Sequence, residues 1–282
     1  MVKGQLYIVP TPIGNLKDIT LRALDVLKSV DIIAAEDTRQ TIKLLNHYNI
    51  KKKLISYHQH NEQGKSEDIV ELLKQGNNIA LVSDAGTPAI SDPGSVVVKR
   101  CIDANIKYEV LPGATALIPA LIYSGLDTTK FLFRGFLPKD NKLKKEVIEE
   151  IKDCQETIII YEAPHRLLNT LKFLKENLNN RRISIIREIS KLHEEVHRFT
   201  LEEAIDYYNY NPTKGEYVIV IEGKSKEELE KEELDQWKEL SISEHILFYI
   251  EGGMSKKEAI KKVAQDRKMP KSEIYKYSID IN

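Results

Sequence analysis

The chain has 282 residues and lacks the sequence features of several specialised protein classes. Its two cysteines, Cys101 and Cys154, are too few for a disulfide framework or a cysteine-rich zinc site, and no metal site is predicted. No apolar run reaches the roughly 20 residues that span a bilayer, and the N-terminus lacks the pattern of a signal peptide. We therefore expect a cytoplasmic protein that has no contact with membranes.

An excess of charge of one sign is also missing. The chain contains 42 Lys and Arg residues against 43 Asp and Glu residues, which gives a formal net charge of −1. This balance excludes a chain that binds nucleic acid through its overall charge, so any surface for RNA must be a local patch. The length is sufficient for two domains with sizeable cores and a small third piece.

The first part of the chain, residues 1–113, alternates short apolar runs with amphipathic stretches. This rhythm predicts an N-terminal α/β domain with a mainly parallel sheet that helices cover on both faces. In the first helix we expect Leu21, Leu24 and Leu27 to share one face. The expected strands are residues 5–9, 31–35, 54–57, 79–82 and 108–111. We expect one helix that starts near Thr20 and three helices that cover residues 38–48, 66–75 and 94–104.

Residues 114–224 form the second predicted domain, again of the α/β class. Its strand content is higher and its connections are shorter, which favours a mixed sheet. The expected strands are residues 131–137, 157–161, 183–187, 195–199 and 217–222, and the expected helices are residues 114–124, 142–152, 164–177 and 201–208.

Residues 225–282 are predicted to form a linker and a small helical domain. Ser255 is a suitable N-cap for a helix that turns Ala259, Ile260, Val263 and Ala264 inward, and Ser272 is a suitable N-cap for the next helix. Two short helices joined by a turn are typical of a helix-turn-helix. The segment is locally basic, which favours RNA binding, while the alternative is a helical cap with solvated lysines. The basic residues are Lys256, Lys257, Lys261, Lys262, Arg267, Lys268, Lys271 and Lys276.

The most informative stretch is residues 78–94, where an apolar strand runs into a loop rich in Gly, Pro, Ser and Asp. We expect Asp92 to cap a helix that carries Pro93 in its first turn. Asp84 and Asp92 are the only ionisable groups of this loop, whereas a loop that cradles phosphate usually supplies a cation. The loop therefore favours a ligand with hydroxyls and a positive centre, such as the sulfonium of S-adenosylmethionine, with a simple tight connection as the alternative.

Six segments of the chain carry a more specific signal. They are residues 9–16 (VPTPIGNL), 35–39 (AEDTR), 83–88 (SDAGTP) with 90–94 (ISDPG), 111–115 (LPGAT), 161–166 (YEAPHR) and 187–195 (REISKLHEE). In this order they resemble the tetrapyrrole methylase superfamily. More narrowly, they resemble the branch that methylates the ribose 2′-hydroxyl of a cytidine in small-subunit ribosomal RNA. The likeness covers residues 1 to about 224. One departure is Ile189-Ser190, where the family pattern has Leu-Thr.

The resemblance implies a cofactor, S-adenosylmethionine, in a cleft between two α/β domains. It also implies a substrate, 16S rRNA in the decoding region of the 30S subunit, and a homodimer. The C-terminal segment resembles the small C-terminal domain of the same branch. The cofactor residues implied by the loop and the superfamily pattern are Pro10, Ser83, Asp84, Ala85, Gly86, Pro88, Ile90, Ser91 and Asp92, with Thr115, Ala116 and Ala163 approaching from the second side.

A ribose 2′-hydroxyl is a weak acid, so its methylation needs alignment and a group that handles the proton. The candidates kept for that role are Glu36, Lys191 and His193. The candidate RNA ligands are Arg39, Arg166, Lys256, Lys257, Lys261 and Lys262.

Two other functions compete with this interpretation. A tetrapyrrole small-molecule methylase of the same superfamily is disfavoured by the basic C-terminal segment and by the motif at residues 35–39. A non-catalytic rRNA-binding assembly factor is disfavoured because the whole loop at residues 83–94 is retained.

Overall fold

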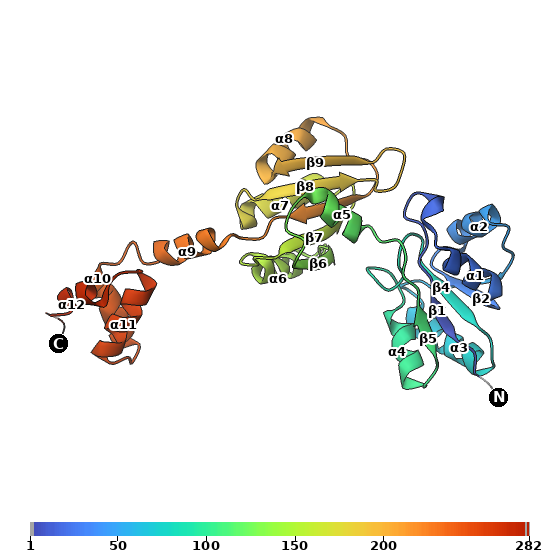
Figure 1. Ribbon diagram of the computed structural model, residues 1–282, viewed down its shortest axis with the longest axis horizontal. Coiled ribbons are helices and arrows are strands. Elements are labelled where there is room, and N and C mark those ends of the chain that lie inside the picture. Colours follow the sequence, from blue (N-terminus) through green and yellow to red (C-terminus); the bar gives the residue numbers. More distant parts are fainter. Residues whose placement is uncertain (1–2, 280, 282) are drawn as a thin grey trace. The chain divides into compact units, whose positions relative to one another are not determined.

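The computed structural model describes residues 3–279 and residue 281 (Figure 1). The chain divides into two compact units. The first unit contains Met1–Ile151 and Glu156–Glu222, and the second contains Lys152–Gln155 and Gly223–Asn282. The first unit holds two separate five-stranded sheets. The domain boundary that we expect near residue 113 stays a prediction.

The first sheet has the strand order β3-β2-β4-β1-β5, and all its pairings are parallel. Its carboxyl ends therefore lie along one edge, where the loops after β1, β2, β4 and β5 meet. The predicted parallel sheet is confirmed. The strands are β1 (Leu6–Ile8), β2 (Ile32–Ala35), β3 (Lys53–Ser56), β4 (Ile79–Val82) and β5 (Tyr108–Val110).

Helices cover both faces of this sheet, as expected (Figure 1). Successive residues of a strand point to opposite faces, so β2 sends Ile33 toward one core and Ala34 toward the other. Leu27 and Leu45 from the first two helices belong to one core, and Leu73 from the third helix belongs to the other. The helices are η1 (Leu16–Asp18), α1 (Leu21–Ser29), α2 (Thr38–His47), α3 (Glu62–Lys74) and α4 (Ser95–Asp103).

The second sheet has the order β6-β7-β10-β8-β9. Only the β6–β7 pairing is parallel, and the other pairings are antiparallel, so the predicted mixed sheet is confirmed. Helix α5 supplies Ala120 and Leu121 to the core on one face. The elements are β6 (Phe131–Phe136), β7 (Thr157–Glu162), β8 (Arg182–Arg187), β9 (Glu195–Thr200), β10 (Tyr217–Ile221), α5 (Leu117–Ser124), α6 (Asn141–Ile151), α7 (Leu167–Leu178) and α8 (Leu201–Tyr210).

The second unit contains four helices within the described residues: α9 (Lys226–Asp235), α10 (Ile242–Glu251), α11 (Lys256–Asp266) and α12 (Lys271–Lys276). Ser255 caps α11 through a reciprocal capping box with Glu258, as predicted. The predicted inward residues of α11, Ala259, Ile260, Val263 and Ala264, are all buried in the core of this unit.

Three local expectations are wrong. Leu21 is 80% exposed, because it is the first residue of α1 and the buried face of that helix contains Ala23 and Leu27 instead. Asp92 does not cap α4, because Gly94 has a φ of 151° and the helix begins only after it. Ser272 lies inside α12, whose N-cap is Pro270.

Over residues 3–279 and 281, no helix is long and apolar enough to cross a membrane. Nor do these residues contain a group of three or more His, Cys, Asp or Glu side chains that could hold a metal ion.

Candidate functional site

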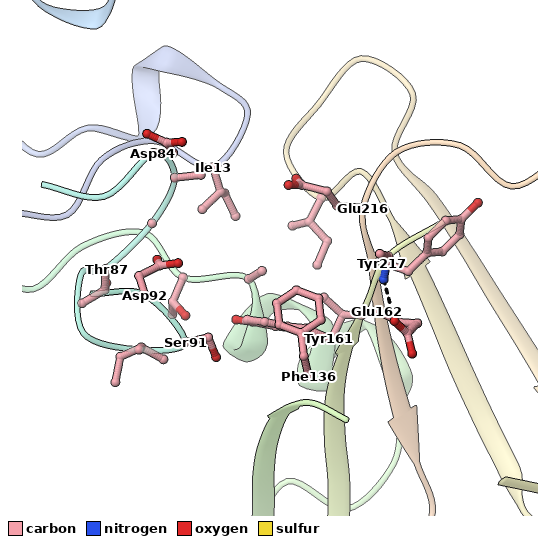
Figure 2. Close-up of a pocket in the computed structure, with 18 of the residues that line it drawn as sticks. Ile13, Asp84, Thr87, Ser91, Asp92, Phe136, Tyr161, Glu162, Glu216 and Tyr217 are labelled. Carbon is pink, nitrogen blue, oxygen red and sulfur yellow. Dashed lines mark hydrogen bonds between the residues drawn. The ribbon is translucent and has the colours of Figure 1, made fainter. Parts of the chain in front are cut away.

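A cavity of about 520 Å³ lies at the carboxyl edge of the first sheet and is closed by residues of the second sheet. Figure 2 shows Asp84, Ser91 and Asp92 on one side of it, facing Tyr161 and Glu216 on the other. The predicted site residues that line it are Glu36, Asp84, Ala85, Gly86, Ile90, Ser91, Asp92, Thr115, Ala116, Ala163 and Lys191.

The loop after β4 has an unusual backbone. Gly86, Ala89, Ser91 and Gly94 all have positive φ values, of 84°, 68°, 64° and 151°. Such conformations persist only where the surroundings impose them, and they are concentrated at functional sites. Neither Ala89 nor Ser91 is a glycine, so the strain of this loop must be held by other contacts.

Those contacts come from neighbouring loops. The backbones of Thr11 and Gly86 exchange two hydrogen bonds, of 2.9 and 3.0 Å. The Thr11 hydroxyl donates to the Ser83 carbonyl, and the Thr87 hydroxyl donates to the Ala114 carbonyl. The loop is therefore fixed before any ligand arrives.

Carboxyl groups dominate the first-sheet side of the cavity. Burial raises the pKa of Asp92 to about 7, with further increases from the charges of Glu36 and Asp84. Burial also raises the pKa of Glu36, with the charge of Asp84 as the next cause. Asp84 accepts the Asp37 backbone N–H at 3.0 Å. A positively charged ligand placed here would offset the mutual repulsion of these groups.

The second-sheet side carries a paired cation. The Lys191 ammonium lies 2.9 Å from Glu188 Oε1 and 2.8 Å from Glu216 Oε2. Burial alone would lower the pKa of Lys191, but the hydrogen bonds to Glu188 and Glu216 outweigh burial and raise it. Lys191 is therefore held as an ammonium by two carboxylates, and its part in handling the proton stays a prediction.

Several predicted residues lie outside the cavity lining. His193 is exposed in the turn between β8 and β9, which leaves it poorly placed to handle a proton in the cavity. Ser83 and Pro88 belong to the loop after β4 but are buried and absent from the cavity lining. Pro10 is also buried and faces Gly113, where an added Cβ would lie 2.4 Å from the proline.

The candidate RNA ligands have three kinds of surroundings. The Arg39 side chain is 87% exposed and lies 2.7 Å from Asp37 Oδ2. Arg166 donates to the Leu137 carbonyl and lies 3.3 Å from the buried carboxylate of Glu162, so it already has partners within the fold. Lys256, Lys257, Lys261 and Lys262 are exposed on α11, in the other unit.

Other lining residues had no assigned role. Glu216 and Tyr217 reach the site because β10 pairs antiparallel with both β7 and β8, which sets Tyr217 beside Glu162 and Arg187. Nothing local in the sequence marks this, since it depends on strand register. The lining residues that lie outside every segment singled out above are Phe136, Glu216, Tyr217 and Val218. The lining residues that lie within those segments but had no assigned role are Ile13, Thr87, Tyr161, Glu162, Pro164, His165 and Ile189.

Comparison with known proteins gives a consistent result. A family model described as Tetrapyrrole (Corrin/Porphyrin) Methylases matches residues 5–205. The Ribosomal RNA small subunit methyltransferase I of Bacillus subtilis (strain 168) is 52% identical over 272 residues, which cover 96% of this chain and 93% of that protein. The protein of the same name from Halalkalibacterium halodurans is 50% identical over 273 residues, which cover 97% and 94%.

The chain belongs to the ribosomal RNA small subunit methyltransferase I family of the tetrapyrrole methylases. The resemblance inferred from the motifs is therefore confirmed. A crystal structure of diphthine synthase has the same fold, with a TM-score of 0.65 at 15% identity over 79% of this chain and 91% of that chain. The predicted α/β tetrapyrrole-methylase fold, with two sheets followed by C-terminal helices, is confirmed as well.

The residues of the cavity fit the cofactor of this family, S-adenosylmethionine. Glu36, Asp84 and Asp92 offer carboxylates to a positive centre and to hydroxyls. Phe136 and Tyr161 stand at an edge-to-face angle of 67° and present apolar area to a planar ring. Gly86 permits close approach of the loop at residues 11–14, since an added Cβ there would lie 3.2 Å from Ile13.

Proposed function

We propose that the chain transfers a methyl group from S-adenosylmethionine to the ribose 2′-hydroxyl of a cytidine in 16S rRNA, in the decoding region of the 30S subunit. The observation that carries the proposal is the 52% identity, over 96% of the chain, to a relative named Ribosomal RNA small subunit methyltransferase I. The acidic cavity with its strained loop supports the cofactor part of the proposal independently.

S-adenosylmethionine, when bound, supplies an electrophilic methyl group on a positively charged sulfur. Asp84, Asp92 and the backbone of the loop after β4 would hold it, with Ile90, Thr115, Ala116 and Ala163 completing the wall. Because the loop is already fixed by Thr11 and Thr87, little ordering is needed on binding.

Of the three candidates for handling the proton, we propose Glu36. It lines the cavity at the end of β2, and burial raises its pKa, which makes the carboxylate a stronger base. Lys191 is retained as an ammonium by Glu188 and Glu216, and His193 lies outside the lining. Lys191 would instead hold Glu216 in place beside the cavity.

A direct test uses 30S particles from cells that lack this protein, purified protein and S-adenosylmethionine with a labelled methyl group. We expect label in the small-subunit rRNA at one cytidine. A ribose 2′-O-methyl group protects the following phosphodiester from alkaline cleavage, whereas a base methyl group does not. Label at a position that alkali still cleaves, or none at all, would contradict the proposal.

For the second unit we propose a role in RNA binding. Lys257 and Lys261 are exposed on α11, and Lys256 and Lys262 flank them. Deleting residues 225–282 should leave the affinity for S-adenosylmethionine almost intact while sharply reducing methylation of the 30S particle. Reversing Lys261 and Lys262 to Glu should give a milder loss with a weaker dependence on salt. A truncated protein that methylates at the full rate would show that these helices are only a solvated cap.

We also propose that the protein is a homodimer and works in the cytoplasm, where its ribosomal substrate is found. Support for the dimer comes only from the resemblance to the family. Sedimentation at micromolar concentration checks the dimer, and a monomer there would refute it.

A further inference from the structure

A second cavity, of about 580 Å³, adjoins the one already described. Its walls come from the loop after β1, from one face of α2 and from several residues that also line the first cavity. The shared residues are Ile13, Asp84, Ala85, Lys191 and Glu216. A group bound in one cavity is therefore separated from the other only by this common boundary.

The two cavities differ in charge. Apart from the shared residues, the first is lined by the carboxyl groups of Glu36, Asp92 and Glu162. The second has no carboxyl group of its own among its described lining residues, and it adds Lys43 and His47. Since Asp84 and Glu216 lie at the boundary that both cavities share, the side of the second cavity formed by α2 favours an anionic group, while the first cavity favours a cationic one.

Helix α2 presents these polar groups as a row. Gln40, Lys43 and His47 are spaced by three and four residues, so they share one face of the helix. The Lys43 ammonium donates to Gln40 Oε1 at 3.0 Å. In the part of the chain that the structure describes, no carboxylate lies within 4.0 Å of it, whereas Arg39 pairs with Asp37 and Lys191 pairs with two glutamates.

The facing wall is built to hold its shape. The Tyr48 hydroxyl donates to the Leu16 carbonyl at 2.6 Å, and the Ser190 hydroxyl donates to Asp18. Gly14 packs so closely on the turn after β8 that an added Cβ would lie 2.4 Å from Lys191 Cγ. The wall of the second cavity that faces α2 is therefore held in place by contacts between segments far apart in the sequence.

We propose that this second cavity binds the ribose-phosphate backbone of the acceptor RNA, with Lys43 contacting a phosphate and with Gln40 and His47 beside it. The acceptor ribose then lies at the shared boundary, next to the methyl donor in the first cavity. This inference rests on the proposed function and extends it by assigning the substrate side of the site to α2.

The test compares Lys43→Glu with Lys51→Glu. Lys51 is exposed, precedes β3 and is absent from the lining of both cavities, so the charge change is matched and the location is not. For Lys43→Glu we expect the KM for 30S particles to rise about tenfold and the salt dependence of 30S binding to fall by about one phosphate contact. The rate at saturating 30S and the affinity for S-adenosylmethionine by calorimetry should stay close to those of Lys51→Glu.

Each outcome separates the inference from the proposed function. Equal KM values for Lys43→Glu and Lys51→Glu, with an active wild type, would overturn the inference and leave the function standing. Loss of S-adenosylmethionine binding in Lys43→Glu, with binding kept in Lys51→Glu, would also overturn it, since the second cavity would then serve the cofactor. A wild type that binds S-adenosylmethionine but never methylates 30S particles would overturn the proposed function and the inference with it.

Discussion

The two sheets build the same cavity in different ways. In the first sheet every pairing is parallel, so each contribution follows directly after a strand: Glu36 after β2 and Asp84 after β4. In the second sheet the antiparallel pairing of β10 brings the start of one strand beside the ends of β7 and β8. Glu216 therefore meets Lys191 from a distant part of the chain.

The two sides also differ in how their charges are satisfied. On the first-sheet side burial and mutual repulsion raise the pKa values of Glu36, Asp84 and Asp92. On the second-sheet side Lys191 pairs with Glu188 and Glu216. The first side thus keeps carboxyl groups available for a ligand, while the second uses its charges to hold its own shape. This difference predicts unequal effects of matched substitutions.

The largest effect is expected from Glu36→Gln, compared with Glu216→Gln on the opposite side. If Glu36 takes the proton, its loss should lower kcat by about a hundredfold or more, in the usual range for a general base. Glu216→Gln keeps the shape of a paired side chain and should cost less than about tenfold. Single-turnover methylation of 30S particles measures both. Equal losses of kcat in the two variants would contradict the proposed difference in role between the two sides of the cavity.

Asp84→Ala should come next. It removes a carboxylate that lines the cavity and accepts the Asp37 N–H, so the affinity for S-adenosylmethionine should fall by about tenfold to a hundredfold. Asp68→Ala is the control, because Asp68 is an exposed aspartate on α3, paired with Lys65 and absent from the cavity lining. Calorimetry gives both affinities, and an unchanged value for Asp84→Ala would refute its role in binding the cofactor.

Lys191→Met should act in the opposite direction on cofactor affinity. Removing a positive charge from the cavity should tighten binding of the cationic cofactor, by about threefold. The same change leaves Glu188 and Glu216 without their counterion, so the thermal midpoint should fall. Calorimetry and thermal unfolding test the two parts. Weaker cofactor binding would mean that Lys191 contacts the cofactor itself.

The smallest effect concerns protons. The pKa of Asp92 is raised from 3.8 to about 7 in the folded chain. The stabilising contribution of this carboxyl is therefore complete below its ordinary pKa and is lost as the pH rises through about 7. Asp92→Asn should raise the thermal midpoint relative to wild type at about pH 8 and change it little at about pH 4.

The same group predicts a calorimetric signature. A bound positive charge should lower the pKa of Asp92, so cofactor binding near pH 7 should release part of a proton. Titrations in two buffers of different ionisation enthalpy measure that release. Asp92→Asn should abolish this proton release. An unchanged release in that variant would mean that Glu36 or Asp84 releases the proton instead.

Prediction from sequence succeeded where neighbours in sequence are neighbours in space. The run Ile79–Val82 followed by a Gly-rich and Pro-rich loop specified a buried strand and an acidic loop, and the structure shows that loop lining the cavity. It failed for Asp92 as a helix cap, because the positive φ of Ser91 and Gly94 delays the helix and the Asp92 carboxyl lines the cavity instead. The sequence offered no means of anticipating that turn.

The amino-acid sequence by itself determined the parallel first sheet, the mixed second sheet, the family and the acidic loop after β4. Hydrophobic period, turn residues and motif spacing are local properties, so they can be followed along the chain. Only the tertiary structure decided that Lys191 is neutralised by Glu216, that Arg166 is held by Glu162 and that Lys43 faces a second cavity. Those outcomes depend on the register of antiparallel strands and on which loops pack together, and both are set by contacts between residues far apart in the sequence.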